Sequence, residues 1–149
     1  MNGATDLTTL LATMEPELSD TEVVFCTLPH ADREDIGRLA PIGMFQEREG
    51  TSLIIQRSVA EQHGMPFDAV MRAITLNVHS SLTAVGFTAA VAGRLARHGI
   101  SANVVAARFH DHVFVPATDA ERALGILRTL QAEAASGHDA IAATRPDGG

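Results

Sequence analysis

The sequence predicts an α+β fold in which two tandem copies of a β-(α)-β-β-α pattern follow one another along 149 residues. One observation is an internal repeat at an offset of 60 residues, which aligns residues 53–61 with residues 113–121. Both segments read as a strand, a hydroxyl residue, Ala-Glu and a helix. A second observation is the hairpin pattern in front of each segment. This order is half of a ferredoxin-like βαββαβ unit. We therefore expect antiparallel sheets with helices on one face, in which the two copies either contribute a strand to each other's sheet or pack side by side.

The first half of the chain carries local signals for short elements separated by turns. Asp6 precedes a run that is typical of a capped helix, and Pro16 ends that helix early. The elements expected here are a helix over 6–12, a strand over 22–28, one helical turn within 30–40, hairpin strands over 42–47 and 52–57, and a helix over 58–63 closed by Gly64.

The second half shows clearer periodicity. Ile74, Leu76 and Val78 recur at every second position, which predicts a half-buried strand. Ser80 and Ser81 are expected to cap the helix that follows, and Gly86 inside that helix suggests a close backbone approach to a strand or a ligand. This helix is expected to have Val85, Phe87, Val91 and Leu95 on its apolar face and to stop at His98-Gly99-Ile100.

Strands are expected over 103–109 and 113–115. In the last expected helix, Thr118 and Glu121 have capping-box spacing, Leu124, Leu127 and Leu130 form an apolar stripe, and a frayed tail follows from Ser136.

Composition excludes several classes of chemistry. The net charge is −7 and all 11 basic residues are arginine, so there is neither a Schiff-base lysine nor a P-loop lysine. Tyrosine is absent, which removes tyrosine acid catalysis, and no basic tract suits nucleic acid. No apolar run is long enough to span a membrane, and the acidic N-terminus is unlike a signal peptide. The single Cys26 forms no disulfide framework, is expected to be a small buried side chain, and fits a reducing cytoplasm.

Residues 109–116, FHDHVFVP, place two histidines around an aspartate directly before a strand. The His-x-His spacing can bring both rings to one face of a strand, but a metal site needs a third and usually a fourth ligand. His79 is a candidate ligand, although nothing in the sequence places it close. Because aspartate favours turns, we expect His110-Asp111-His112 to form a polar hairpin tip, with a binding-rim role or a metal site as alternatives.

The run from residue 78 to residue 124 resembles an ACT domain. The resemblance rests on Val78, on Leu82-Thr83-Ala84-Val85-Gly86, and on the passage His98-Gly99-Ile100-Ser101-Ala102-Asn103-Val104. In the first half, EVVFCTLP and FQEREGTSLII are similar to a bacterial family of short two-copy ACT proteins without a firmly assigned function. The resemblance implies an N-terminal ACT-like domain over 6–68, a C-terminal ACT domain over 69–134 and a flexible tail over 135–149.

The resemblance also implies a function. ACT domains commonly bind small amino acids and regulate enzymes, without catalytic activity or a cofactor. Their ligand lies where the first loop and helix start of one domain meet a strand of a neighbour, and a helix N-terminus suits a carboxylate. The implied ligand-binding residues are Ser80, Ser81, Leu82, Val85 and Gly86, together with Asn103 and Val104 of an adjacent copy. The implied partners are an amino acid, a second copy of the chain in a homodimer, and a separate regulated enzyme.

Two other interpretations stay open at the level of sequence. A small metal-dependent or histidine-based hydrolase would use His79, His110 and His112 with Asp111, and requires these groups to converge. An interaction scaffold that has lost its ligand site predicts a filled loop between Ser80 and Gly86.

Overall fold

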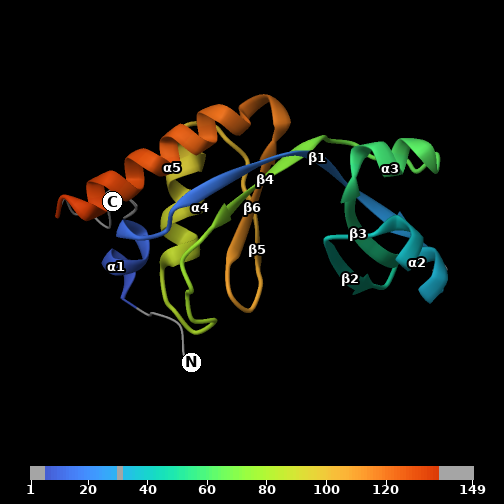
Figure 1. Cartoon of the computed structure of the whole chain (residues 1–149), viewed down its shortest axis with the longest axis horizontal. Helices are drawn as coiled ribbons and strands as arrows, with labels where there is room; N and C mark the ends of the chain where they lie inside the picture. The colour runs from blue at the N-terminus through green and yellow to red at the C-terminus, as the bar shows by residue number, and fades with distance from the viewer. Residues whose placement is uncertain (1–5, 30–31, 138–149) are drawn as a thin grey trace, which may run out of the picture. The chain divides into compact units, whose positions relative to one another are not determined.

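The computed structural model describes residues 6–29 and 32–137, and this part of the chain has the predicted α+β fold (Figure 1). The elements are, in chain order, α1 (Leu7–Ala12), β1 (Pro16–Leu28), α2 (Arg33–Leu39), β2 (Gly43–Glu47), β3 (Gly50–Gln56), α3 (Arg57–Gln62), β4 (Met71–Leu76), α4 (Phe87–Arg97), β5 (Asn103–Ala106), β6 (Asp111–Pro116), a 3-10 turn (Ala117–Asp119) and α5 (Ala120–Ala135).

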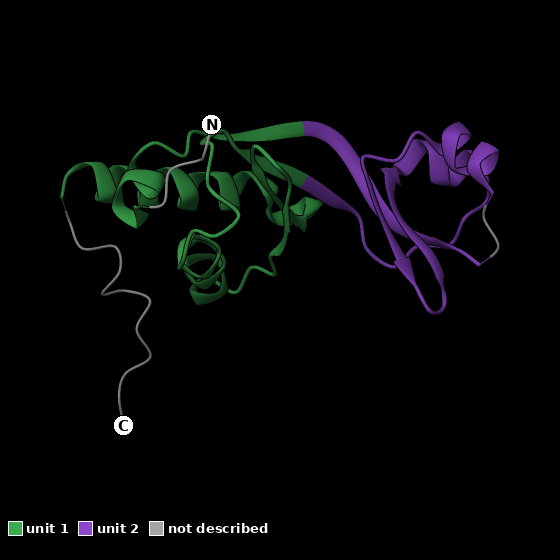
Figure 2. Cartoon of the chain, turned by 90° about the horizontal axis from the view of Figure 1, so that it is seen from below, with its two compact units in different colours: residues 1–19, 73–149 green, residues 20–72 purple. Residues whose placement is uncertain are grey.

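The strands follow the order β2-β3-β1-β4-β6-β5. The pairs β1–β3, β2–β3 and β5–β6 are antiparallel. The chain forms two compact units, unit 1 with residues 1–19 and 73–149 and unit 2 with residues 20–72 (Figure 2). Both central strands contribute to both units, because the division between the units falls after Ser19 in β1 and after Arg72 in β4. The boundary that the sequence predicts at 68/69 stays a prediction.

The core of unit 1 lies between its strands and its three helices. Ile74 and Leu76 of β4 and Val113 and Val115 of β6 all belong to it. Since alternate residues of a strand point to the same face, the helices cover one face of these strands. The helical contribution comes from Leu10 and Leu11 of α1, Phe87, Val91 and Leu95 of α4, and the predicted stripe of α5 with Leu124, Leu127 and Leu130.

Unit 2 has a smaller core of its own. Val24 pairs with Ile55 and Cys26 pairs with Leu53 across the β1–β3 ladder, and all four side chains are buried. Leu39 of α2 and Ala60 of α3 complete this core. The prediction that Cys26 is a small buried side chain is confirmed, and burial raises the pKa of its thiol.

Several element boundaries differ from the sequence prediction. Pro16 opens β1, so the strand begins six residues before the expected position 22. Helix α2 has seven residues rather than one turn, because Asp32 accepts a hydrogen bond from the Asp35 amide and caps it. Helix α5 ends at Ala135, as expected, and the predicted tail lies outside the described residues from 138 on. Among the helices of the described ranges, none has the length and apolar content to span a bilayer.

Of the three predicted helix caps, the structure has one and lacks two. Asp6 caps α1 by accepting a hydrogen bond from the Thr9 amide at 2.9 Å, as predicted. The prediction that Ser80 and Ser81 cap α4 is wrong, because the helix begins at Phe87 and Gly86 is its N-cap residue. The predicted capping box of the last helix is also wrong, because a 3-10 turn precedes α5 and its N-cap is Asp119 without a side-chain hydrogen bond.

Candidate functional site

A small pocket lies in unit 1 between the β4–α4 loop and the β5–β6 hairpin. Its volume is about 60 Å³. Ligand sites for drug-sized molecules are roughly 300 Å³ or more, so the pocket as observed accommodates only a small group. The lining residues are Ser80, Ser81, Leu82, Ala84, Phe87, Thr88, Ala106 and Asp111.

The floor of this pocket is polar and buried. Ser80 and Asp111 are 7% and 6% exposed, and the Ser80 hydroxyl donates to Asp111 Oδ2 at 3.3 Å. Asp111 is the first residue of β6 and pairs with Ala106 of β5, so the sheet fixes its position. A buried carboxylate is costly unless hydrogen bonds or a positive charge compensate it. The Ser80 hydroxyl supplies one such hydrogen bond, so the pocket presents the Asp111 carboxylate to a group that enters it.

The N-terminus of α4 borders the same pocket. Gly86 has φ 92° and ψ −11°, a left-handed conformation that glycine adopts without steric cost. No side chain caps the helix at this residue, and Phe87 and Thr88 at the start of the helix line the pocket. The first amides of a helix lack intrahelical acceptors and carry a partial positive charge. This end of the pocket consequently suits an anionic group.

Local turns shape the β4–α4 loop, and Ala84 of this loop packs against the core of unit 1. The Ser81 hydroxyl accepts a hydrogen bond from the Thr83 amide at 3.2 Å, and the Ala84 amide donates to the Ser81 carbonyl at 3.0 Å. Leu82 is 72% exposed and Val85 is 85% exposed. The prediction that Val85 belongs to the apolar face of the helix is therefore wrong, because the helix starts two residues later.

The structure brings together part of the predicted ligand site. Ser80, Ser81 and Leu82 line the pocket, and Gly86 is the N-cap of the helix whose first turn contributes to it. Asn103 and Val104 lie on β5 opposite Phe114 and Val113, and neither lines the pocket of its own copy. The family resemblance implies that those two residues act from an adjacent copy, and that assignment stays a prediction.

The histidine-aspartate triplet does not form the tip of its hairpin. The tip is the turn from Ala107 to His110, where the Ala107 amide donates to the His110 carbonyl. Asp111 and His112 already belong to β6, so the expected turn role of Asp111 is wrong. Sequence reasoning missed Asp111 as a carboxylate of the pocket, because its contact with Ser80 joins residues 31 positions apart.

The two histidines of the triplet contact strand β4 and the loop after it. His110 Nδ1 lies 3.4 Å from the Val78 carbonyl, and His112 Nδ1 lies 3.0 Å from the Thr75 hydroxyl. Burial, assisted by the charge of His110, lowers the pKa of His112, while Asp111 acts in the opposite direction. Across residues 6–29 and 32–137, no three histidine, cysteine or carboxylate side chains group in a way that could hold a metal ion.

Comparison with known proteins defines the class. Two models described as ACT domain match residues 2–72 and residues 63–129, and together they cover most of the chain. The chain belongs to the ACT domain family, in a two-copy form. No match was found among curated proteins.

Similar solved structures agree with this class. A Vibrio cholerae protein of unknown function, described as a possible transport protein, is 46% identical with a TM-score of 0.77, over 84% of this chain and 95% of that chain. The ligand-free regulatory subunit of aspartate kinase from Thermus thermophilus is 12% identical with a TM-score of 0.60, over 80% and 97%. Escherichia coli aspartokinase III, in complex with aspartate and ADP, is 15% identical with a TM-score of 0.52, over 77% of this chain and 32% of that chain.

Proposed function

We propose that the protein is a non-catalytic regulatory module that binds a free amino acid at the β4–α4 loop. Membership of the ACT family supports a ligand-binding regulatory role. The fold shared with the regulatory subunit of an aspartate kinase is compatible with this role. The proposed site consists of the predicted residues Ser80, Ser81, Leu82, Val85 and Gly86, with Asp111 added.

The observation that carries the proposal is the pairing of two opposite charges in one pocket. The Asp111 carboxylate lies at one side and the uncapped N-terminus of α4 borders the other. A zwitterionic amino acid has a matching pair, an ammonium group for Asp111 and a carboxylate for the amides of the first helical turn. A simple carboxylic acid or a simple amine matches only one of the two groups.

The small volume of the pocket requires the loop to move when the ligand enters. Leu82 and Val85 are the side chains available for this, since both are largely exposed. Closing them over the ligand would remove their apolar surface from water, which contributes to binding. The ligand would then shift the balance between an open and a closed loop by binding the closed one more tightly.

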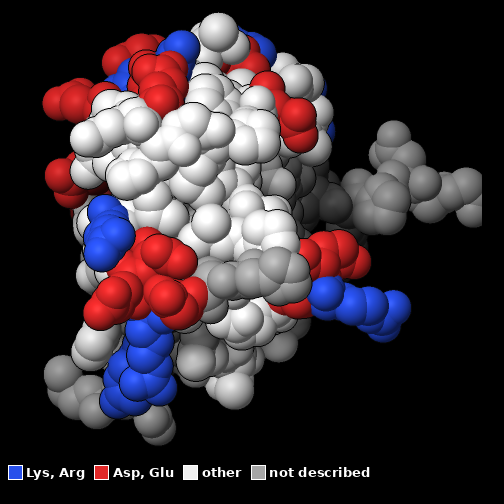
Figure 3. All heavy atoms as spheres, turned by 90° about the vertical axis from the view of Figure 1, so that its right-hand side faces the viewer, with Lys and Arg blue, Asp and Glu red and all other residues white. Residues whose placement is uncertain are grey.

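A second copy of the chain is part of the proposal. The strand order leaves β2 and β5 at the edges, and open edges of a sheet favour pairing with another chain. On unit 2, Phe25, Ile42, Met44 and Phe45 expose large apolar side chains on or beside β1 and β2. Figure 3 presents a face of unit 2 on which charged side chains gather at the margins around an uncharged area. A homodimer would cover apolar surface of this kind. As a separate part of the proposal, Asn103 and Val104 of one copy would lie near the β4–α4 loop of another.

The regulated enzyme in this proposal is a separate chain. Closure of the β4–α4 loop would change how the protein pairs with this enzyme or with a second copy of the chain. The buried free thiol of Cys26 is compatible with a reducing cytoplasm, which is the proposed location.

A thermal-shift screen of the purified protein against the free amino acids tests the proposal. An amino acid at 100 times its dissociation constant should add about 2.7 kcal/mol of stability. Replacing Asp111 by asparagine should abolish that shift, because the ammonium group loses its partner. The matched control is Asp68→Asn, at an exposed position outside the pocket, which should keep the shift. A shift that survives Asp111→Asn, or no shift with any amino acid, would contradict the proposal.

A further inference from the structure

A second and larger hollow lies in unit 1 between α4 and α5. Its volume is about 570 Å³, within the range of small-molecule sites. It shares no lining residue with the pocket at the β4–α4 loop. Its walls carry three arginines and a histidine, namely Arg94, Arg97, Arg122 and His98, beside the short or apolar surface of Gly125 and Ile126.

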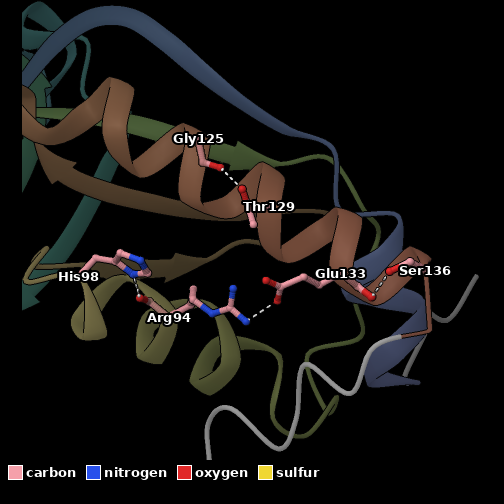
Figure 4. A network of polar contacts seen from close by, with 6 residues as sticks. All are labelled: Arg94, His98, Gly125, Thr129, Glu133 and Ser136. Atoms are coloured by element: carbon pink, nitrogen blue, oxygen red, sulfur yellow. Dashed lines mark hydrogen bonds and ion pairs between the residues drawn. The ribbon is translucent and has the colours of Figure 1, made fainter.

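Arg94 is the buried element of this groove. The residue is 7% exposed, and its side chain extends from α4 toward α5, where Nη2 lies 2.6 Å from Glu133 Oε2 (Figure 4). Its Nε is buried and has no hydrogen-bond partner. A buried guanidinium N–H without an acceptor is unfavourable, so an anionic oxygen that reaches it would be stabilised.

Contacts with backbone carbonyls and with one carboxylate position further polar groups of the groove. Arg122 Nη1 donates to the His98 carbonyl at 2.9 Å, and its Nη2 lies 3.3 Å from Asp119 Oδ1. His98 Nδ1 lies 3.0 Å from the Arg94 carbonyl. The end of α4 is itself fixed by a glycine stop, in which the Ile100 amide donates to the Leu95 carbonyl. The basic side chains therefore have defined anchors before any ligand binds.

The charges of the groove select an anion. Among its lining residues, three arginines and one glutamate leave a charge of +2 with His98 counted as neutral, in a chain whose net charge is −7. A phosphate monoester carries about −1.5 to −2 at neutral pH, whereas a carboxylate carries −1. The planar fork of arginine matches phosphate oxygens in pairs. The volume exceeds that of a phosphate group alone, and Ile126 and Gly125 offer a surface for an organic part.

We propose that the α4–α5 groove binds the phosphate group of a small phosphorylated metabolite, in contact with Arg94, Arg97 and Arg122. This site is independent of the amino-acid pocket, and it gives the module a second input. Each of the two ligands would contact a different end or face of α4, since the helix starts at the loop pocket and carries Arg94 and Arg97 in its last turns.

The test is an NMR titration of the ¹⁵N-labelled full chain with inorganic phosphate and with AMP, at constant ionic strength set with sodium chloride. The signal of the Arg94 Nε–Hε group should move on addition of either phosphate compound, and acetate at the same ionic strength should leave it unchanged. AMP should bind more tightly than inorganic phosphate, because its organic part has room in the groove. Equal or weaker binding of AMP would contradict an esterified ligand.

Three variants distinguish binding of AMP in the groove from a general effect of positive charge on the protein. Arg94→Lys keeps the charge but removes the fork and Nε, and Arg122→Gln removes an exposed charge. Each should weaken AMP binding by about tenfold, the effect of losing one charge-assisted hydrogen bond. The matched control is Arg128→Gln on the same helix α5, exposed and outside the groove, which should bind as the unmodified protein does. The proposal is overturned if no phosphate-specific shift is seen, or if Arg128→Gln weakens binding as much as Arg122→Gln.

Discussion

Replacing Gly86 by alanine tests the reasoning about the start of α4. The backbone at Gly86 has φ 92°, and an alanine there meets the steric cost of the left-handed region, about 1–2 kcal/mol. A Cβ at this position would lie 3.3 Å from Leu7 Cδ2, so that flexible side chain has to move slightly. We therefore expect the free energy of unfolding to fall by about 1–2 kcal/mol.

Circular dichroism is the suitable assay for this change, because the chain has no tryptophan or tyrosine for fluorescence. For a chain of this size, 1 kcal/mol corresponds to roughly 2–4 °C in Tm, so the variant should melt about 2–8 °C lower. Gly99→Ala, with φ 72° and nothing within 4 Å of the added Cβ, isolates the backbone contribution from the Leu7 contact. Gly125→Ala lies inside α5 with open space around it, and should raise stability by about 0.5–1 kcal/mol. A Gly86→Ala variant as stable as the unmodified protein would refute the assignment of Gly86 as a left-handed N-cap.

Three further predictions concern the two cores and one histidine. Leu127→Ala removes a fully buried side chain of α5 and should cost about 2–5 kcal/mol in urea unfolding, whereas exposed Arg128→Ala should change stability by less than about 0.5 kcal/mol. Because Cys26 is buried and its pKa is raised, its thiol should react with a disulfide reagent far more slowly in the native protein than in urea. An equally fast reaction in the native protein would contradict the burial of Cys26 in the core of unit 2. Because the pKa of His112 is lowered below 6.5, the unfolded chain binds the proton more readily, and stability should fall as the pH drops below about 6.5. Tm measured from pH 7.5 to pH 5 should show this loss, and His112→Gln should reduce it; an unchanged pH profile in the variant would exclude this origin.

Local signals in the sequence predicted most of the elements. The Asp6 cap, the turn of the β2–β3 hairpin and the glycine stop after α4 all depend on residues that are close together along the chain, and all are found in the structure. The leucine stripe of α5 was predicted for the same reason, since its period of three to four residues is visible without knowledge of the partner helices.

The start of α4 shows where local reasoning failed. Ser80 and Ser81 are good capping residues, but Ser80 instead donates to Asp111 and Ser81 closes a turn with Thr83. A glycine within a helical pattern gave no sign that the chain turns there with a positive φ. The helix begins at Phe87 because that side chain is buried in the core of unit 1, a tertiary effect that overrides the capping preference.

The position of the pocket was predictable in outline, and its polar groups were not; that the pocket binds a ligand stays a proposal. The family resemblance indicated the loop from Ser80 to Gly86, whereas the carboxylate that completes the pocket comes from β6. In the sequence, Asp111 stood out as part of a histidine-rich turn and of the hydrolase alternative, and not as a residue of this pocket. The arginine groove left no motif at all, because Arg94 and Arg122 lie on different helices and only the packing of α4 on α5 brings them to one hollow.

The most direct measurement of the central claim is isothermal titration calorimetry of the amino acid that stabilises the protein most, compared with its N-acetyl and C-terminal amide derivatives. Recognition of a zwitterion by Asp111 and the N-terminus of α4 predicts that each derivative binds at least about tenfold more weakly, because each removes one charge from the ligand. Binding of both derivatives as tightly as the free amino acid would contradict the proposed site.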